Sequence, residues 1–305
     1  MIELATIWEV GTFAFSSYAW AKKQLSKEAD HAIERVERFI NKKGPLIQIH
    51  RVISQAPRVS AEGKADITED VAAEAVRHRS TLELNELHAI AGDWDGNNVD
   101  SIRAQTLDFA EVLALRTRAK EQRLPPPKIL SAGAVVVCPS ARCVLVHRRS
   151  VTSATYPNAL HILGGAYKPP VRYKFIDSPG DRMSLEFTMV REVFEESGLV
   201  VRRYEEPICV AQELDTGFIQ YVHLGVRVTK DQFANLHQNS EGDLLRMPFD
   251  ELKSSLLDAS NWVPTGRAHI LMWLGLGAPG AGWNARFDGE KASQVFDSIT
   301  GKKKT

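Results

Sequence analysis

Hydrophobic and polar positions divide the chain into a helical first part and a mixed second part. Residues 4–41 hold long runs of helix-forming residues without a proline, and their charged residues concentrate after Lys22. Helical spacing returns over residues 82–90 and 100–122, and Thr68-Glu69-Asp70 combines a capping residue with two acids. The pattern therefore predicts an all-α N-terminal domain over residues 1–123.

The spacing of hydrophobic residues changes from helical to strand-like at the proline run Leu124-Pro125-Pro126-Pro127. Proline has no amide donor and disfavours helix in the residue before it, so residues 124–128 are predicted to be a linker. Beyond it, two β-branched runs flank Pro139-Ser140-Ala141-Arg142, which indicates a hairpin. The mixture predicts an α/β (α+β) domain over residues 129–290, followed by a tail over 291–305. Strands are expected at 134–137, 144–146, 208–213 and 218–228, and helices at 185–197, 250–257 and 267–276.

Composition and charge narrow the class of protein. The 305 residues are 44% hydrophobic, enough for a sizeable core, and contain 38 basic and 38 acidic residues. A formal net charge of zero gives no electrostatic bias towards nucleic acid. The three cysteines, Cys138, Cys143 and Cys209, form no CxxC pair, so we expect a reducing, cytoplasmic setting.

The segment from Val10 to Ala21 is free of charge and rich in aromatic residues. It is shorter than the roughly 20 residues that a spanning helix needs. No basic residue precedes Lys22, so the positive start of a signal peptide is missing. We expect a helix that packs on its own domain or joins copies into a homo-oligomer, with a membrane anchor as the less favoured alternative.

The most informative stretch is Arg191-Glu192-Val193-Phe194-Glu195-Glu196-Ser197-Gly198-Leu199. On a helix, its three glutamates share an arc of about 100°. Gly198 suits the left-handed residue that ends a helix, where the helix dipole disfavours anions. A divalent cation such as Mg²⁺, which takes oxygen ligands, would relieve the repulsion. A solvated acidic face remains the alternative.

This stretch resembles the second half of the Nudix box, G-x5-E-x7-R-E-U-x-E-E-x-G-U, in which U is a bulky aliphatic residue. Seven residues fall on the pattern, and the preceding His161-Ile162-Leu163-Gly164-Gly165 is similar to the family's strand that enters a Gly-Gly turn. The resemblance covers about residues 129–276. It implies a Nudix-like α/β/α sandwich with a mixed sheet.

The first half of the box departs from the family pattern. An ungapped match needs a glycine at position 177 and a glutamate at position 183, where the sequence has Asp177 and Met183. If Gly165 is the box glycine, residues 168–181 are an insertion. The departure puts the catalytic efficiency and the loop geometry in doubt more than metal binding.

The resemblance implies Mg²⁺- or Mn²⁺-dependent hydrolysis of a phosphoanhydride in a nucleoside diphosphate linked to another moiety. Glu192, Glu195 and Glu196, with Gly165, would bind the metal. Glu195, Glu192 or the later acid Glu241 would take the catalytic roles, beside Arg191. Arg148, Gly164 and Gly165 would contact the phosphates.

Two alternatives stay open. Met183 favours a catalytically weak or inactive module that senses a nucleotide such as ADP-ribose and signals to the N-terminal helices. The aromatic residues Trp8, Phe13, Phe15, Tyr18 and Trp20 favour an effector tethered to a partner or a membrane.

Overall fold

The computed structural model describes residues 26–79, 87–91, 94, 96, 101–153, 155–167, 184–201, 204, 207–237 and 242–301. Expectations for residues 1–25, for the insertion at 168–181 and for Met183 and Glu241 therefore lie outside the described residues. No helix in the described ranges is long and apolar enough to cross a bilayer.

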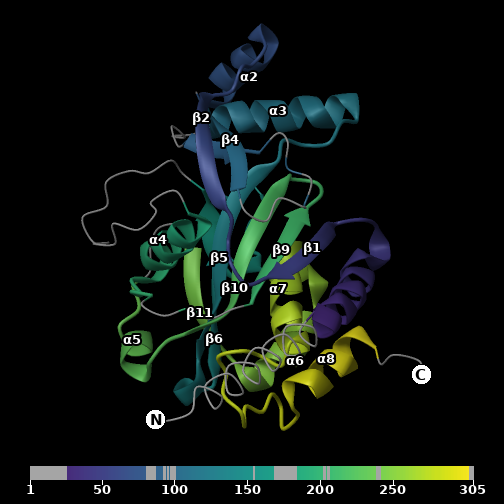
Figure 1. Cartoon of the computed structure of the whole chain (residues 1–305), viewed down its shortest axis with the longest axis vertical. Coiled ribbons are helices and arrows are strands. Elements are labelled where there is room, and N and C mark those ends of the chain that lie inside the picture. The colour runs from purple at the N-terminus through teal and green to yellow at the C-terminus, as the bar shows by residue number, and fades with distance from the viewer. Residues whose placement is uncertain are drawn as a thin grey trace, which may run out of the picture.

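One mixed sheet runs through the molecule (Figure 1). Its β10–β5 and β2–β4 pairs are parallel, and the other strand pairs are antiparallel. The main order is β1 (Ile47–Ile53), β9 (Ile208–Glu213), β10 (Phe218–Arg227), β5 (Ile129–Cys138), β3 (Leu87–Ile90), β4 (Ser101–Asp108) and β2 (Arg58–Lys64). Off this path, β5 also pairs with β6 (Cys143–Arg149) and β8 (Leu163–Ala166), and β6 pairs with β7 (Leu160–His161) and β11 (Gly242–Pro248).

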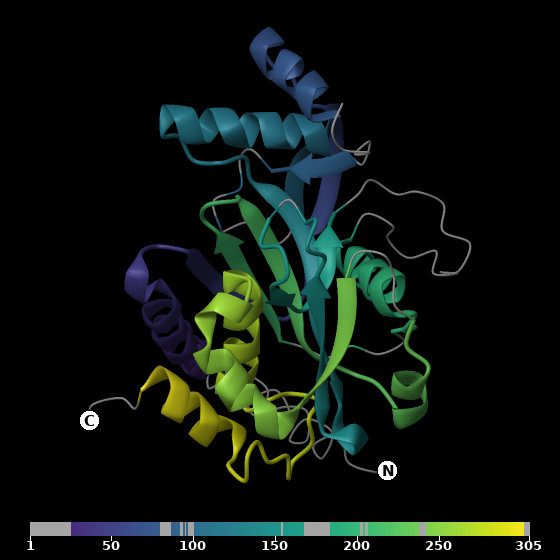
Figure 2. The ribbon, with the colours of Figure 1, turned by 180° about the vertical axis from the view of Figure 1, so that it is seen from behind.

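Helices cover both faces of the central strands, as the views from opposite sides show (Figures 1 and 2). On one face, α4 (Leu185–Ser197) packs on β5 and β8, and its Leu185, Met189 and Val193 are buried in one core with residues of β10. On the other, the helix over residues 26–40 packs with α6 (Phe249–Leu257), α7 (Pro264–Gly275) and α8 (Ala292–Thr300). The remaining helices are α2 (Glu69–Arg79), α3 (Phe109–Gln122), α5 (Lys230–Ala234) and the short 3-10 turns η1 (Asn41–Lys43), η2 (Pro139–Ala141) and η3 (Ala259–Asn261).

The predicted α/β class with a mixed sheet is confirmed, whereas the all-α description of residues 1–123 is wrong. Residues 47–53, 58–64, 87–90 and 101–108 form strands. The helical spacing expected over 100–122 spans a strand and a helix. In β4 the buried residues Ile102 and Ala104 alternate with exposed neighbours, which is the period of a strand, while Leu107 lies out of that alternation.

The two ends of the described chain also differ from expectation. Ala32, Val36 and Ile40 are buried in the same core as Val295 and Phe296 of α8. The buried Arg35 donates to Asp297 at 2.6 Å and to the carbonyl of Gly301. Residues 292–300 thus form a packed helix where a tail was expected. The boundaries between separately folding domains stay a prediction.

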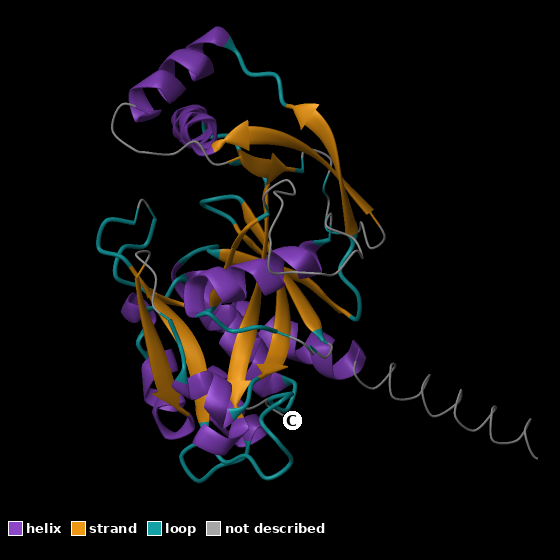
Figure 3. Cartoon of the chain, turned by 90° about the vertical axis from the view of Figure 1, so that its left-hand side faces the viewer, coloured by secondary structure: helices purple, strands orange, loops and turns teal. Residues whose placement is uncertain are grey.

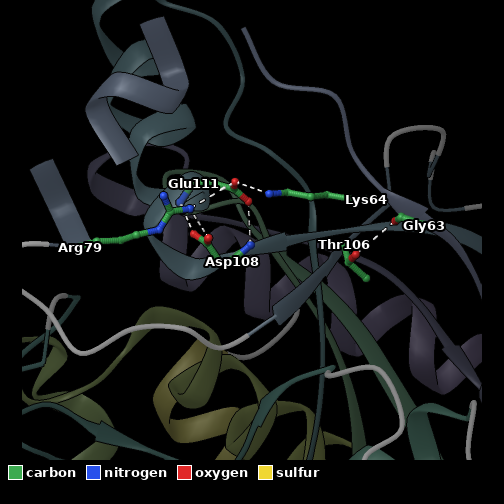
Figure 4. A network of polar contacts seen from close by, with 6 residues as sticks. All are labelled: Gly63, Lys64, Arg79, Thr106, Asp108 and Glu111. Atoms are coloured by element: carbon green, nitrogen blue, oxygen red, sulfur yellow. Dashed lines mark hydrogen bonds and ion pairs between the residues drawn. The ribbon is translucent and has the colours of Figure 1, made fainter. Parts of the chain in front are cut away.

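A polar network fixes the start of α3 (Figure 4). The Asp108 carboxylate accepts from the Glu111 amide and the Glu111 carboxylate accepts from the Asp108 amide, both at 2.9 Å, which forms a reciprocal capping box. Lys64 of β2 binds the Glu111 carboxylate at 2.7 Å, and Arg79 of α2 binds Asp108. Helix α3 is therefore anchored to both β2 and α2, above the end of the central strands (Figure 3).

Candidate functional site

The acidic helix α4 is built as the sequence predicted. Ser184 caps its start by accepting from the Phe187 amide at 3.0 Å, and Gly198 ends it in the left-handed conformation with φ 73°. Glu192 and Glu196 are buried, with 6% and 5% of their surfaces exposed, whereas the Glu195 side chain is about one-third exposed. Two of the three carboxylates therefore point into the molecule and one lies at its surface.

Both buried carboxylates meet the Gly164–Gly165 segment of β8. The Gly164 amide donates to Glu196 Oε2 at 2.8 Å. A β-carbon added at Gly165 would lie 2.5 Å from Glu192 Cδ and 2.9 Å from its Oε1. Only glycine leaves room for the carboxylate at this position, because any side chain would overlap it. Gly164 has φ 152° and a β-carbon there would lie 2.5 Å from Gly133 Cα, so it is needed for the packing of β5 on β8.

Arg191 organises the carboxylates from within the helix. It is 2% exposed, and its guanidinium lies 2.5 Å from Glu192 Oε1 and 3.2 Å from Glu195 Oε2. It also donates to the Ala166 carbonyl of β8 at 3.0 Å. Arg191 thus ties α4 to β8 and orients two acidic side chains.

Histidine and arginine from β6 complete this end of the site. His147 is buried, and its Nδ1 lies 3.3 Å from Glu196 Oε1. Arg148, the predicted phosphate contact, is exposed, whereas its neighbour Arg149 lines the cavity beside the glutamates. The alternation of side chains along a strand could have pointed to Arg149, since residues 145, 147 and 149 share one side of β6.

A cavity of about 360 Å³ opens beside these residues. Its walls combine the glutamates and the Gly-Gly segment with residues from β5, β7 and β10, and with residues 150, 152, 153, 155 and 156. The lining includes Phe109, His147, Arg149, Tyr156, His161, Gly164, Gly165, Glu192, Glu196, Glu213, Phe218 and Gln220. Glu195 is not among the lining residues.

Titratable groups at the far end of the cavity are strongly perturbed by burial. Burial raises the pKa of Glu213, whose carboxylate accepts from Thr216 at 2.5 Å and from Thr265 of α7 at 2.8 Å. Burial lowers the pKa of His161 to about 3, so this ring is neutral at ordinary pH. Sequence patterns gave no signal for either residue, because each becomes part of the site only through tertiary packing.

Tyr156 closes one side of the cavity in a strained conformation. Its φ is 47°, in the left-handed region that a non-glycine residue seldom adopts. Its hydroxyl donates to Asp215 Oδ2 at 2.7 Å, and Arg149 donates to the Thr155 carbonyl at 3.0 Å. These bonds tie Tyr156 to Asp215 and Thr155 to Arg149 of β6.

The carboxylates of Glu192 and Glu196 could supply part of the ligands of a hard divalent cation. Among the described residues, no group of three or more His, Cys, Asp or Glu side chains stands ready to hold a metal ion. The site nevertheless offers two buried carboxylates, beside a glycine whose missing β-carbon leaves space for one of them. Mg²⁺ accepts such a pair of carboxylates together with substrate phosphates. Glu192, Glu196 and the Gly165 backbone fit such a group, whereas Glu195 does not line the cavity.

Comparisons with known proteins place the chain next to Nudix structures. No family model matches the chain, and no curated protein matches it. Among solved structures, it is similar to a MutT protein from Methanosarcina mazei Go1, with 19% identity over 47% of this chain and 89% of that one, at a TM-score of 0.31. A NUDIX hydrolase from Alicyclobacillus acidocaldarius has 17% identity over 48% of this chain and 90% of that one, at a TM-score of 0.33.

A third similar structure is larger. It is a bifunctional NMN adenylyltransferase/ADP ribose pyrophosphatase from Francisella tularensis, complexed with AMP and a Mn ion. The identity is 14% over 53% of this chain, at a TM-score of 0.36, and the chain spans only 45% of that protein's length.

Proposed function

We propose that the chain is a Mg²⁺- or Mn²⁺-dependent hydrolase of the Nudix type that cleaves a phosphoanhydride in a nucleoside diphosphate linked to another moiety. The observation that carries the proposal is the meeting of Glu192 and Glu196 with Gly164–Gly165 at the wall of a cavity. The helix that supplies them and its Gly198 cap carry the REVFEESGL segment over residues 191–199.

The residues of the site have separate tasks in this proposal. Glu192 and Glu196, with the Gly165 backbone, would hold the metal, and Glu195 would join them or act as the general base. When bound, the cation supplies charge neutralisation for the diphosphate and a lower pKa for bound water. Arg191 keeps Glu192 and Glu195 in position. Arg149 replaces Arg148 as the candidate phosphate contact, and Glu241 stays a candidate base.

Hydrolysis of a panel of nucleotide diphosphates tests this function. The purified chain with Mg²⁺ or Mn²⁺ is expected to release AMP or another nucleoside monophosphate from at least one compound. Glu195→Gln should lower kcat by about 10² to 10⁴-fold, the range that a general base contributes. Glu251→Gln on the exposed face of α6 removes the same charge far from the site and should leave kcat unchanged.

A catalytically weak nucleotide sensor is the second candidate. Arg191 binds two of the acidic side chains that a metal would need, which favours weak metal binding. Met183 stands where the box pattern has its first glutamate. If no compound of the panel is cleaved, and a nucleotide raises the unfolding temperature of both the parent and Glu195→Gln, the hydrolase proposal is refuted and the sensor is supported.

A further inference from the structure

Two of the three cysteines lie opposite each other in the sheet. Cys138 ends β5 and Cys143 begins β6, and the register of this antiparallel pair places them face to face. The α-carbons of such a pair are about 4.5 to 5.5 Å apart, within the range of about 4.4 to 6.8 Å that a disulfide spans. The third cysteine, Cys209 of β9, instead faces Val52 and Val222.

The two sulfur atoms lean towards the same loop. Side chains of directly opposed residues leave a sheet on the same side. Cys138 Sγ lies 3.6 Å from Ser140 Oγ, and the Cys143 thiol donates to the Ala141 carbonyl at 2.9 Å. Both contacts are made to η2, which joins the two strands, so the sulfurs lie on one side of the sheet and at one end of the hairpin.

The backbone around the pair is already fixed. Arg142 has φ 52°, its amide donates to the Pro139 carbonyl at 3.2 Å, and its carbonyl accepts from the Phe249 amide at 2.8 Å. Bond formation between Cys138 and Cys143 therefore needs rotation of side chains and no rearrangement of the hairpin.

The two thiols differ in their access to solvent. Cys138 is fully buried in the core that faces α4, whereas Cys143 is half-buried at the edge of that core. Burial and the neighbouring Cys138 thiol raise the pKa of the Cys143 thiol. Only a small fraction of Cys143 is thereby a thiolate at neutral pH, so its reaction with an oxidant is slow. A small oxidant meets Cys143 first, and the buried Cys138 reacts only with Cys143.

We propose that Cys138 and Cys143 form a reversible disulfide within the chain, with a low-molecular-weight disulfide such as oxidised glutathione as the oxidant. The Cys143 thiolate attacks one sulfur of the oxidant, and the first leaving thiolate takes up the proton that Cys143 lost. Cys138 then loses its proton and attacks the Cys143 sulfur of the mixed disulfide, and the second leaving thiolate takes up that proton. The two protein thiols give up two electrons, and the oxidant is reduced to two thiols.

The bond would lock the end of the β5–β6 hairpin, whose second strand carries His147 and Arg149 to the cavity. The inference does not depend on the proposed function, because it needs neither a substrate nor a metal. The spacing of the two cysteines in the sequence gave no signal for it, since only the register of the ladder brings them together.

Oxidation of the folded full chain in buffers of reduced and oxidised glutathione tests the proposal. Free thiols are alkylated at each ratio and counted by intact mass, and the bonded peptides are mapped. The parent should fall from three free thiols to one. Cys209→Ala, the matched control, should fall from two to none. Cys138→Ala should stop at a single glutathione adduct on Cys143, and Cys143→Ser should gain neither a disulfide nor an adduct.

The folded state should favour the bond. The equilibrium constant for disulfide formation should be about tenfold or more greater in the folded chain than in urea, because the native ladder already holds the two thiols together. Four results would overturn the inference. They are three free thiols in the parent at every ratio, a glutathione adduct on the parent's Cys143 that never resolves, a disulfide between two chains, and equal equilibrium constants with and without urea. If Cys143→Ser does not fold, the adduct on Cys138→Ala decides.

Discussion

Gly165→Ala is the sharpest test of the link between the Gly-Gly strand and the acidic helix. The new β-carbon would lie 2.5 Å from Glu192 Cδ, whereas ordinary contact begins at 3.4 Å, so the carboxylate must recede by about 1 Å. The atoms that the β-carbon would meet are the end of a side chain rather than backbone, so we expect the Glu192 carboxylate to be displaced while the fold is kept. The displacement disturbs a buried contact, because the carboxylate lies 2.5 Å from Arg191.

A displacement of about 1 Å in a reacting group costs about 10²-fold in rate, or about 2.7 kcal/mol in the activation free energy. Overpacking should also lower the free energy of unfolding by about 1 to 3 kcal/mol. Metal-dependent kcat on the compound found in the panel and urea unfolding measure the two effects. Gly164→Ala is the comparison, because its β-carbon meets the backbone of Gly133 and should destabilise the fold more. A Gly165→Ala chain that folds normally and keeps kcat within about twofold would refute the reasoning.

Two further predictions concern stability. Burial lowers the pKa of His223 to about 4 from an ordinary 6.5, so as pH falls through this window the unfolded chain takes up a proton that the folded chain refuses. The free energy of unfolding therefore falls between pH 6.5 and 4, and His223→Phe should make this fall smaller by up to about 3 kcal/mol. Urea unfolding at each pH measures this, and an unchanged dependence of the unfolding free energy on pH would contradict it. Val36→Ala, in the helix that packs on α8, should lower the free energy of unfolding by about 2 kcal/mol, whereas the exposed Val76→Ala should change it by less than about 0.5 kcal/mol; equal effects would contradict the shared core.

Much of the second half of the fold could be predicted from the sequence. The helix expected over 185–197 is α4, with Gly198 as its cap, and the strand expected over 208–213 is β9. The hairpin of β5 and β6 and the helices α6 and α7 also occur where they were expected. These elements carry strong local signals, such as capping residues, β-branched runs and turns, and local signals survive tertiary packing.

The first half was harder because its strands depend on distant partners. Strand β1 pairs with β9, and β3 joins the central sheet through the single pair Ile90–Ile129. Short strands of this kind have no local signal that distinguishes them from helix. The same limit applies to the site. The glutamates could be found from their motif, whereas Glu213 of β9 and Gln220 of β10 belong to the cavity only because these strands meet the Gly-Gly strand in the folded sheet.

The pairing of β1 with β9 also has a consequence for how the chain is made. Ile47 is synthesised long before Glu213, its partner in the sheet, and Ala32 and Val36 long before Phe296, which packs in the same core. Contacts so distant in sequence form slowly. On the ribosome, the apolar face of residues 26–53 must therefore remain uncovered until nearly the whole described chain has emerged. Expression at low temperature or with chaperones should raise the yield of folded protein, since this early segment is the one exposed to aggregation for longest.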